Sequence, residues 1–170
     1  MGLARTLKNM MLFNEGLAYI GEVKTVTLPT LTRKLEEYRA GGMGGPVQID
    51  MGHEAMELSF TCGGPMRDVL RQYGVTKVNG VYLRFAGVYQ QDDTGAVDSV
   101  EVIVRGRHSE IEMGDQEVGE AGEFKVTSAL AYYKLLWNGR TEIEIDPLGM
   151  IEIVGGVDRL AEQRSALGIF

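Results

Sequence analysis

The sequence alternates strictly between apolar and polar residues over Met56-Glu57-Leu58-Ser59-Phe60-Thr61-Cys62. A period of two places successive side chains on opposite faces of a β-strand, one facing a core and the other facing water. A similar alternation recurs over residues 100–107 and 141–146, where Val and Ile alternate mainly with charged residues. These three segments predict strands that each bury one face.

Three more segments are rich in Val, Tyr, Phe, Thr and Leu, the residues that favour strands: residues 22–28, 81–91 and 124–137. The last of them is apolar on both faces from Leu130 to Trp137, which predicts a strand that is covered on both sides. Asn79-Gly80, Asn138-Gly139 and Asp92-Asp93-Thr94-Gly95 predict hairpin turns. Because these connections are short, neighbouring strands should be antiparallel.

Two short helices are predicted from their end signals and their apolar faces. The first should begin at Pro65 and end at Gly74, with its apolar face formed by Met66, Val69, Leu70 and Tyr73. The second should cover about residues 158–167, with Asp158 as cap, Leu160 and Leu167 facing inward, and Gly168 at its end. We therefore expect one mainly β domain over residues 1–170, an antiparallel β-sandwich or barrel with two short α-helices.

Composition excludes several functional classes. The 170 residues carry 17 Lys and Arg against 24 Asp and Glu, a net charge of −7, which argues against nonspecific binding to DNA or anionic membranes. No stretch approaches the roughly 18 consecutive apolar residues of a membrane span, and the N-terminus lacks the features of a signal peptide. A single cysteine, Cys62, excludes an intramolecular disulfide and suits a reducing compartment.

Two segments break the β pattern. Arg39-Ala40-Gly41-Gly42-Met43-Gly44-Gly45-Pro46 is too rich in glycine for a stable element, and it lacks the Lys of a phosphate-binding loop, so we expect a flexible loop. Residues 110–123 contain six acidic residues and neither Lys nor Arg. A stretch this acidic should be exposed to solvent.

The sequence offers weak signals for catalysis. Asp93-Thr94-Gly95 matches the short signature of aspartic proteases, but that chemistry needs two such loops and the chain has one, so we interpret it as a turn. His53, Glu57 and His108 could form a metal site in a small β-barrel enzyme, although they lie on separate segments without local ligand spacing. We predict that the protein is not an enzyme and has no cofactor.

A resemblance to a known family extends over most of the chain, from about Leu12 to Gly168. The stretch Thr27-Leu28-Pro29-Thr30-Leu31-Thr32-Arg33-Lys34-Leu35-Glu36-Glu37-Tyr38-Arg39-Ala40-Gly41-Gly42-Met43 resembles the leading signature of the major tail tube proteins of contractile-tailed bacteriophages. Later blocks agree in the same order: residues 84–95, 104–107, 144–147, 150–151 and 156–160. Residues 113–122 match least well, so no role of that loop is inherited from the family.

The resemblance implies a virion structural protein, assembled in the host cytoplasm, whose subunits form hexameric rings that stack into a hollow tube inside a contractile sheath. The implied partners are further copies of the chain, the sheath protein, baseplate or initiator and terminator proteins, and a tape-measure protein in the lumen. DNA would pass through without specific binding, and no membrane anchor is implied. Similar tubes occur in genome-free bacteriocin particles and, more distantly, in type VI secretion. A β-sandwich binding module, which would be a stable monomer, is a further alternative.

Antiparallel sheets have open edges, and pairing these edges around a symmetry axis would close a ring into a continuous wall. For contacts between subunits or rings we select an N-terminal arm at about residues 1–14 and a protruding glycine-rich loop at about residues 39–50. The candidate residues are Met10, Leu12, Phe13, Tyr38, Arg39, Gly42, Met43 and Pro46. The N-terminal residues and the loop could instead cover the subunit's own core.

The acidic balance suits a channel for DNA, because inward Lys and Arg would bind phosphates whereas carboxylates repel them. We predict a lumen with a net charge of zero or below. Exposed acidic residues that could face the lumen are Glu101, Glu110, Glu112, Asp115 and Glu117. For the acidic run the alternative is an ordinary solvated loop.

Overall fold

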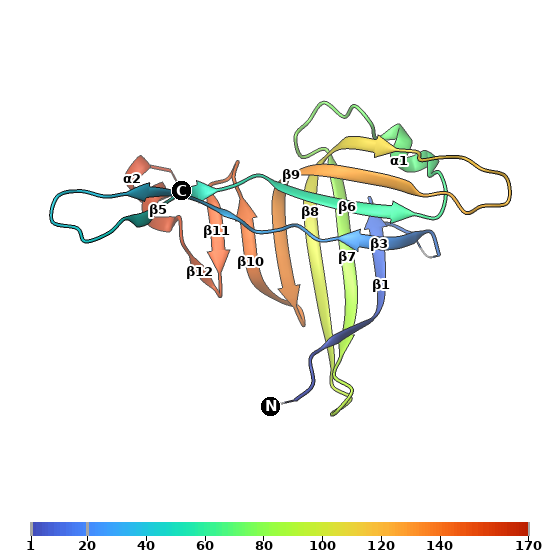
Figure 1. Cartoon of the computed structure of the whole chain (residues 1–170), viewed down its shortest axis with the longest axis horizontal. Coiled ribbons are helices and arrows are strands. Elements are labelled where there is room, and N and C mark those ends of the chain that lie inside the picture. The colour runs from blue at the N-terminus through green and yellow to red at the C-terminus, as the bar shows by residue number, and fades with distance from the viewer. Residues whose placement is uncertain (1, 20, 170) are drawn as a thin grey trace.

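A computed structural model describes residues 2–19 and 21–169 and shows a mainly antiparallel β fold with two short helices (Figure 1). The strands of this described part are β1 (Thr6–Asn14), β2 (Leu17–Ala18), β3 (Val23–Thr27), β4 (Arg33–Tyr38), β5 (Val47–His53), β6 (Met56–Cys62), β7 (Val81–Gln90), β8 (Val97–Glu112), β9 (Phe124–Trp137), β10 (Arg140–Asp146), β11 (Ile151–Val154) and β12 (Val157–Asp158). The helices are α1 (Arg67–Arg71) and α2 (Ala161–Leu167).

Strand β9 organises the large sheet. The strand order is β12-β11-β10-β9-β8-β7-β1-β2, and β6 also pairs with β9 while β3 pairs with β6. Strand β6 pairs with β9 from Phe124 to Leu130, and β10 takes the same edge of β9 from Tyr133 to Trp137. All these pairings are antiparallel, as predicted. Strands β4 and β5 pair only with each other in the described chain.

The core lies where the β3–β6 ribbon crosses the large sheet (Figure 1). A register shift between Arg105 and Gly106 interrupts the β8–β9 ladder at this corner, as a bulge that bends a sheet does. The apolar residues of the alternating stretch 56–62 are all buried and pack against Leu83, Val102 and Phe124, which confirms their predicted inward face. Each large side chain fully buried in this way contributes about 1.5–3 kcal/mol.

Turn chemistry was predicted well for two connections and wrongly for one. Asn138 and Gly139, with φ angles of 50° and 81°, join β9 to β10, and residues 92–95 join β7 to β8. Asn79-Gly80 does not form a hairpin, since it lies between α1 and β7. The glycine is needed there for space, because a Cβ at Gly80 would lie 2.2 Å from Cγ1 of Val75.

Both helices form, but they are shorter and more exposed than predicted. Helix α1 buries Met66 and Val69, whereas Leu70 and Tyr73 are exposed because a helix of five residues presents little more than one turn to the sheet. The C-terminal helix begins at Ala161 because Asp158 belongs to β12, where its carboxylate accepts a hydrogen bond from Leu160 N (3.1 Å). Leu167 is exposed, so its predicted inward position is wrong.

The second half of β9 also differs from the prediction. From Leu130 to Trp137 the residues are partly exposed, with the exception of Tyr133, so this chain alone does not cover both faces. Three parts extend from the body in Figure 1: the β4–β5 hairpin, the loop between β8 and β9, and residues 2–5 before β1 together with the β7–β8 turn. Among residues 2–19 and 21–169 no helix has the length and apolarity to cross a membrane.

Candidate assembly surfaces

The β4–β5 hairpin, here called the arm (residues 33–53), extends the β3–β6 ribbon beyond the sheet (Figure 1). Glu54 N donates to Thr32 O at 2.9 Å, which carries the ladder from the ribbon into the arm. Strand β5 begins at Val47, so the glycine-rich loop is the arm tip, residues 39–46, rather than a loop reaching residue 50.

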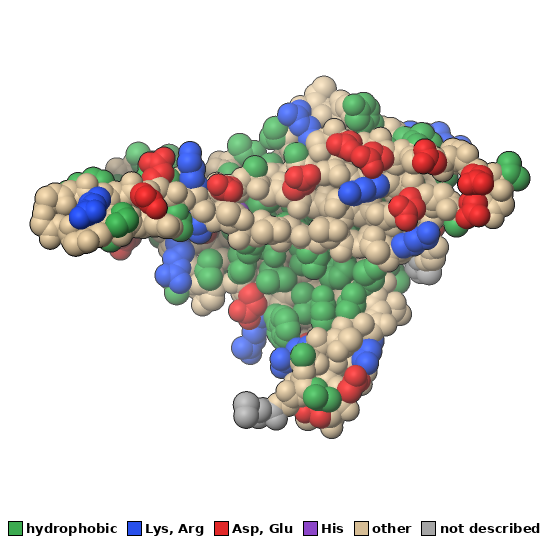
Figure 2. Space-filling model, viewed as in Figure 1, with side chains coloured by type: hydrophobic (Ala, Val, Ile, Leu, Met, Phe, Trp, Pro, Cys, Tyr) green, Lys and Arg blue, Asp and Glu red, His purple; other side chains and the backbone are tan. Residues whose placement is uncertain are grey.

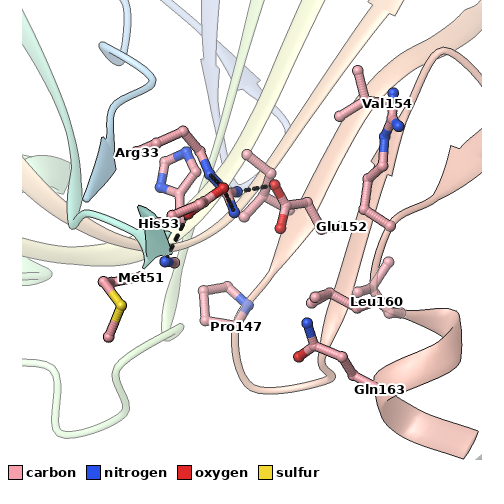
Figure 3. Close-up of a pocket in the computed structure, with 13 residues that line it drawn as sticks. Arg33, Met51, His53, Pro147, Glu152, Val154, Leu160 and Gln163 are labelled. Carbon is pink, nitrogen blue, oxygen red and sulfur yellow. Dashed lines mark hydrogen bonds and ion pairs between the residues drawn. The ribbon is translucent and has the colours of Figure 1, made fainter. Parts of the chain in front are cut away.

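Arg33 fixes the root of the arm (Figure 3). Its Nη2 lies 2.7 Å from Oδ2 of Asp50 on β5, and its Nη1 pairs with Glu152 on β11, so one guanidinium joins both arm strands to the body. These contacts raise the pKa of Arg33, chiefly through the hydrogen bond to Asp50. The pKa of Asp50 is lowered, first by the hydrogen bond from Gly52 N and then by Arg33. An open cavity of about 930 Å³ lies beside this root, between β5, β11 and α2.

One face of the arm is an exposed apolar stripe. Tyr38, Val47, Ile49 and Met51 are 52%, 50%, 43% and 55% exposed. Tyr38 pairs with Val47, and alternation along β5 places Val47, Ile49 and Met51 on the same face. Neither β5 nor this stripe was predicted from the sequence, although the alternation over residues 47–51, beside the glycines, indicates both.

The tip carries the other candidate contact residues. Arg39, Gly42 and Pro46 are exposed, whereas Met43 is partly buried against its own loop. Met43 N donates to Ala40 O at 3.2 Å, and Ala40 N approaches the Met43 sulfur at 3.1 Å. Gly42 has a φ of 85°, a left-handed conformation that glycine adopts without strain.

The N-terminal candidates separate into two groups. Residues 6–14 form β1 within the sheet, and Leu12 is 1% exposed, so this residue covers the subunit's own core. Met10 is partly exposed on the same face of β1. Phe13 lies on the opposite face, where the Arg84 guanidinium stacks at 4.0 Å from its ring centre.

The segment before β1 is attached to the β7–β8 turn. Leu3 N donates to Asp93 Oδ2 at 3.0 Å, and Gln91 Nε2 donates to Leu3 O at 2.9 Å. Arg5 also pairs with Asp98 and lies 5.5 Å from the ring centre of Trp137. These contacts fix the N-terminal residues beside the sheet.

The acidic candidates do not form one group. Glu101 is on the outer face of the large sheet, 3.1 Å from Arg84 Nη1. Glu110 and Glu112 are at the far end of β8, where their mutual contact raises the pKa of Glu110. Asp115 and Glu117 are exposed in the loop that follows, as predicted for the acidic run.

The hypothetical metal site is wrong. His53 lies at the arm root, while Glu57 is exposed on the outer face of β6. His108 faces the core, where Nδ1 lies 2.8 Å from Ser128 Oγ and Nε2 lies 3.0 Å from Gln72 Oε1. Burial lowers the pKa of His108 to about 4. Within the described part of the chain, no group of three His, Cys, Asp or Glu residues could hold a metal ion.

The sheet has free edges that the sequence did not locate. In the described residues the outer edge of β1 from Thr6 to Met11 has no strand partner, since β2 pairs only with Phe13 and Asn14. The outer edge of β3 and both outer edges of the arm are also unpaired there. Such edges are templates for pairing with another chain.

Comparison with known proteins identifies the family of this chain. The sequence matches the family described as Phage tail tube protein FII over residues 4–168. This chain belongs to the phage tail tube protein FII family. It is 44% identical over 172 residues to the tail tube protein of Escherichia phage P2, covering 99% of this chain and 100% of that protein. It is 33% identical over 153 residues to the major tail tube protein of Serratia phage KSP20, covering 89% and 88%.

Solved structures share the fold at low sequence identity. A chain of the extended sheath–tube complex of the extracellular contractile injection system PVC aligns with a TM-score of 0.57 at 10% identity, covering 75% of this chain and 87% of that one. A chain of the anti-feeding prophage cap aligns with a TM-score of 0.56 at 11% identity, with the same coverage. The family resemblance is thus confirmed, and the tail tube protein is a structural component of a phage virion rather than an enzyme.

Proposed function

We propose that this protein forms the inner tube of a contractile phage tail, as hexameric rings stacked around a channel through which DNA enters the host. The observation that carries this proposal is an incomplete sheet in a chain of the tail tube family: β1 offers a free edge from Thr6 to Met11, and β12 at the other end of the strand order has two residues. Pairing these two edges between neighbours, head to tail, would close a continuous barrel wall.

The outer face of the large sheet is the proposed lumen wall. Two of its central cations have partners, since Arg84 pairs with Glu101 at 3.1 Å and Arg105 lies 5.0 Å from the Tyr82 ring centre, and a third, Lys134, is opposite Glu144 in register. Three cations are balanced by three carboxylates on this face, those of Glu101, Glu144 and Asp146. A wall of this kind presents few free cations to phosphates, which would let DNA slide.

The arm tip and its flanking strands are the proposed contacts between rings, through Tyr38, Arg39, Gly42, Met43 and Pro46. Met10 and Phe13 are proposed contacts within the assembled wall, on its two faces. The proposed partners are a sheath protein and a terminator, by analogy with the sheath–tube and tube-terminator complexes of the PVC system. Baseplate or initiator proteins and a tape-measure protein in the lumen complete the set.

Negative-stain electron microscopy of the purified protein at high concentration tests the proposal. We expect rings or hollow rods with a central channel. A protein that stays monomeric at all concentrations, even beside its sheath and baseplate proteins, would contradict it. A structure of the rod that showed a ring of unpaired inward Lys and Arg would contradict the assignment of the lumen face.

A further inference from the structure

Part of the inner face of the large sheet is left uncovered by the β3–β6 ribbon. Figure 2 shows hydrophobic side chains gathered directly below that ribbon, where the sheet continues. The strand registers place six partly exposed residues on this face, here called the shelf: Met10, Tyr89, Leu135, Trp137, Ile143 and Val154. At its β11 end the shelf reaches the arm-root cavity, which Val154 also lines.

The sequence itself indicates that the shelf is meant to be covered. The second half of β9 is apolar on both faces, a pattern typical of strands buried on both sides. In this chain Leu135 and Trp137 nevertheless remain partly exposed on the inner face. Within this chain Arg5 lies 5.5 Å from the Trp137 ring centre and leaves the ring partly exposed. Full cover of the shelf must therefore come from a second molecule.

The arm, like the shelf, exposes apolar side chains to solvent. An isolated two-stranded hairpin is at best marginally stable in water, and this one exposes Tyr38, Val47, Ile49 and Met51 along one face. Residues 40–49 contain no charged side chain, so the tip half of the stripe can be buried without desolvating a charge. The loop at residues 113–123 lacks this property, because its four acidic residues have no neighbouring Lys or Arg in the loop. On β4, Glu36 lies opposite Ile49 in register and shares the stripe face, so its carboxylate must stay at the solvent-exposed margin of any contact.

We propose that the apolar stripe of the arm docks onto the shelf of a second copy of this chain. The arm points away from the body, so a subunit does not cover its own shelf (Figure 1). Each copy then offers one arm and receives another, which is a head-to-tail contact that can repeat around a ring or along a stack. The inference rests on the proposed self-assembly and adds to it the surface that receives the arm.

The contact between one arm and one shelf is small, so we expect it to be stable only within an assembly. Four stripe side chains that are each about half exposed would bury roughly 300–500 Å², since a large side chain covers about 150–250 Å². A standard interface buries about 800 Å² per partner. One arm on one shelf should therefore not hold a dimer, and the contact becomes stable when strand pairing joins the same copies.

Trp137 provides a direct test on the unmodified protein, because it is the single tryptophan of the chain and lies on the shelf. When rods form, its fluorescence maximum should move to shorter wavelength and its quenching by acrylamide should fall. Unchanged emission on assembly would overturn the proposal. Absence of rods from the unmodified protein would contradict the proposed function instead, so the two failures are distinguishable.

Disulfide trapping identifies the arm as the occupant. The double variant Ile49→Cys/Ile143→Cys, oxidised as rods, should give a ladder of cross-linked multimers on a non-reducing gel. The matched control Gln48→Cys/Ile143→Cys places the thiol on the opposite face of β5 and should cross-link about tenfold less, because a disulfide needs Cβ atoms about 4 Å apart. Equal cross-linking from both positions would overturn the proposal. If the double variants do not assemble, the Trp137 shift should be lost in Ile49→Asp and kept in Gln48→Asp, and the reverse result would overturn it.

Discussion

The β3–β6 ribbon and the arm are consecutive lengths of the same two chain segments, but they lie in opposite environments. In the ribbon, Leu58 and Phe60 face inward and are buried by the large sheet. In the arm, Ile49 and Met51 stand in an equally regular alternation and face solvent. An alternation with a period of two shows that one face of a strand is apolar. It does not show whether that face is covered by the same chain or by a neighbouring subunit.

The two regions are also held differently. The ribbon is anchored by a register of seven paired positions between β6 and β9, with the core beneath it. The arm is attached at its root through Arg33, which bridges Asp50 and Glu152. A structural protein that must first fold and then polymerise gains from this division, because the region that makes contacts does not carry the stability of the subunit.

Truncation in the two regions should separate folding from assembly. Phe60→Ala removes a fully buried ring and should cost about 3–5 kcal/mol of unfolding free energy. Ile49→Ala, at a side chain that contacts solvent, should change the stability of the dilute monomer by less than about 0.5 kcal/mol. Urea unfolding at low protein concentration measures both values. A cost at Ile49 comparable with that at Phe60 would show that the arm belongs to the folding unit.

A charge placed at the arm tip should act on assembly alone. Met43→Asp would bring an unpaired carboxylate into every ring contact, at a cost of at least about 2 kcal/mol per contact. The monomer should keep its circular dichroism spectrum and unfolding midpoint, while rods disappear from electron micrographs. Gln48→Asp is the matched control, because it places the same charge on the face of β5 that makes no proposed contact. Normal rods from Met43→Asp would count against a role for the tip.

The sequence predicted the ribbon better than the arm for a physical reason. Residues 56–62 alternate without interruption and are flanked by other strand-like segments, so their inner face could be inferred. Residues 47–51 alternate in the same way, but four glycines and one proline precede them in residues 41–46 and Gly52 follows them, a composition that favours a loop. Composition averaged over a window conceals a short strand beside a glycine-rich turn.

A second limit on prediction from the sequence was that it does not show which residues contact one another in the folded chain. The N-terminal apolar group could equally contact a neighbour or the core, and the structure assigns Leu12 to the core because Phe85 opposes it in register. Strand pairing places Glu57 opposite Ala129 and His108 opposite Ser128, at neighbouring positions of β9 but on opposite faces of the sheet. The spacing of these residues in the sequence does not show this. Family membership, in contrast, was visible from Thr27–Met43 and the later blocks because it does not depend on geometry.

Acid should weaken the body before it weakens the arm root. His108 has its pKa lowered by burial to about 4, below an unfolded value of about 6.5, so the unfolded chain binds the proton first. Stability therefore falls as pH decreases from about 6.5 to 4, by about 2–3 kcal/mol in total. The lowered pKa of Asp50 keeps its ion pair with Arg33 until the pH falls below the ordinary carboxyl range near 4. Urea midpoints between pH 7 and 4, compared with those of His108→Gln, should show a slope that the variant lacks.

Arg33 tests the hinge between the two regions, and its expected effect on stability is smaller than those of Phe60 and His108. Arg33→Gln removes ion pairs that are partly exposed to solvent, so the unfolding free energy should fall by no more than about 1 kcal/mol. The arm should nevertheless become less ordered, because Asp50 and Glu152 lose the group that joins them. Amide hydrogen exchange over residues 34–52 should accelerate, and the protein concentration needed for rods should rise. Lys34→Gln, at the exposed neighbouring position, should leave arm exchange unchanged. Equal exchange in both variants would mean that backbone pairing, rather than Arg33, sets the position of the arm.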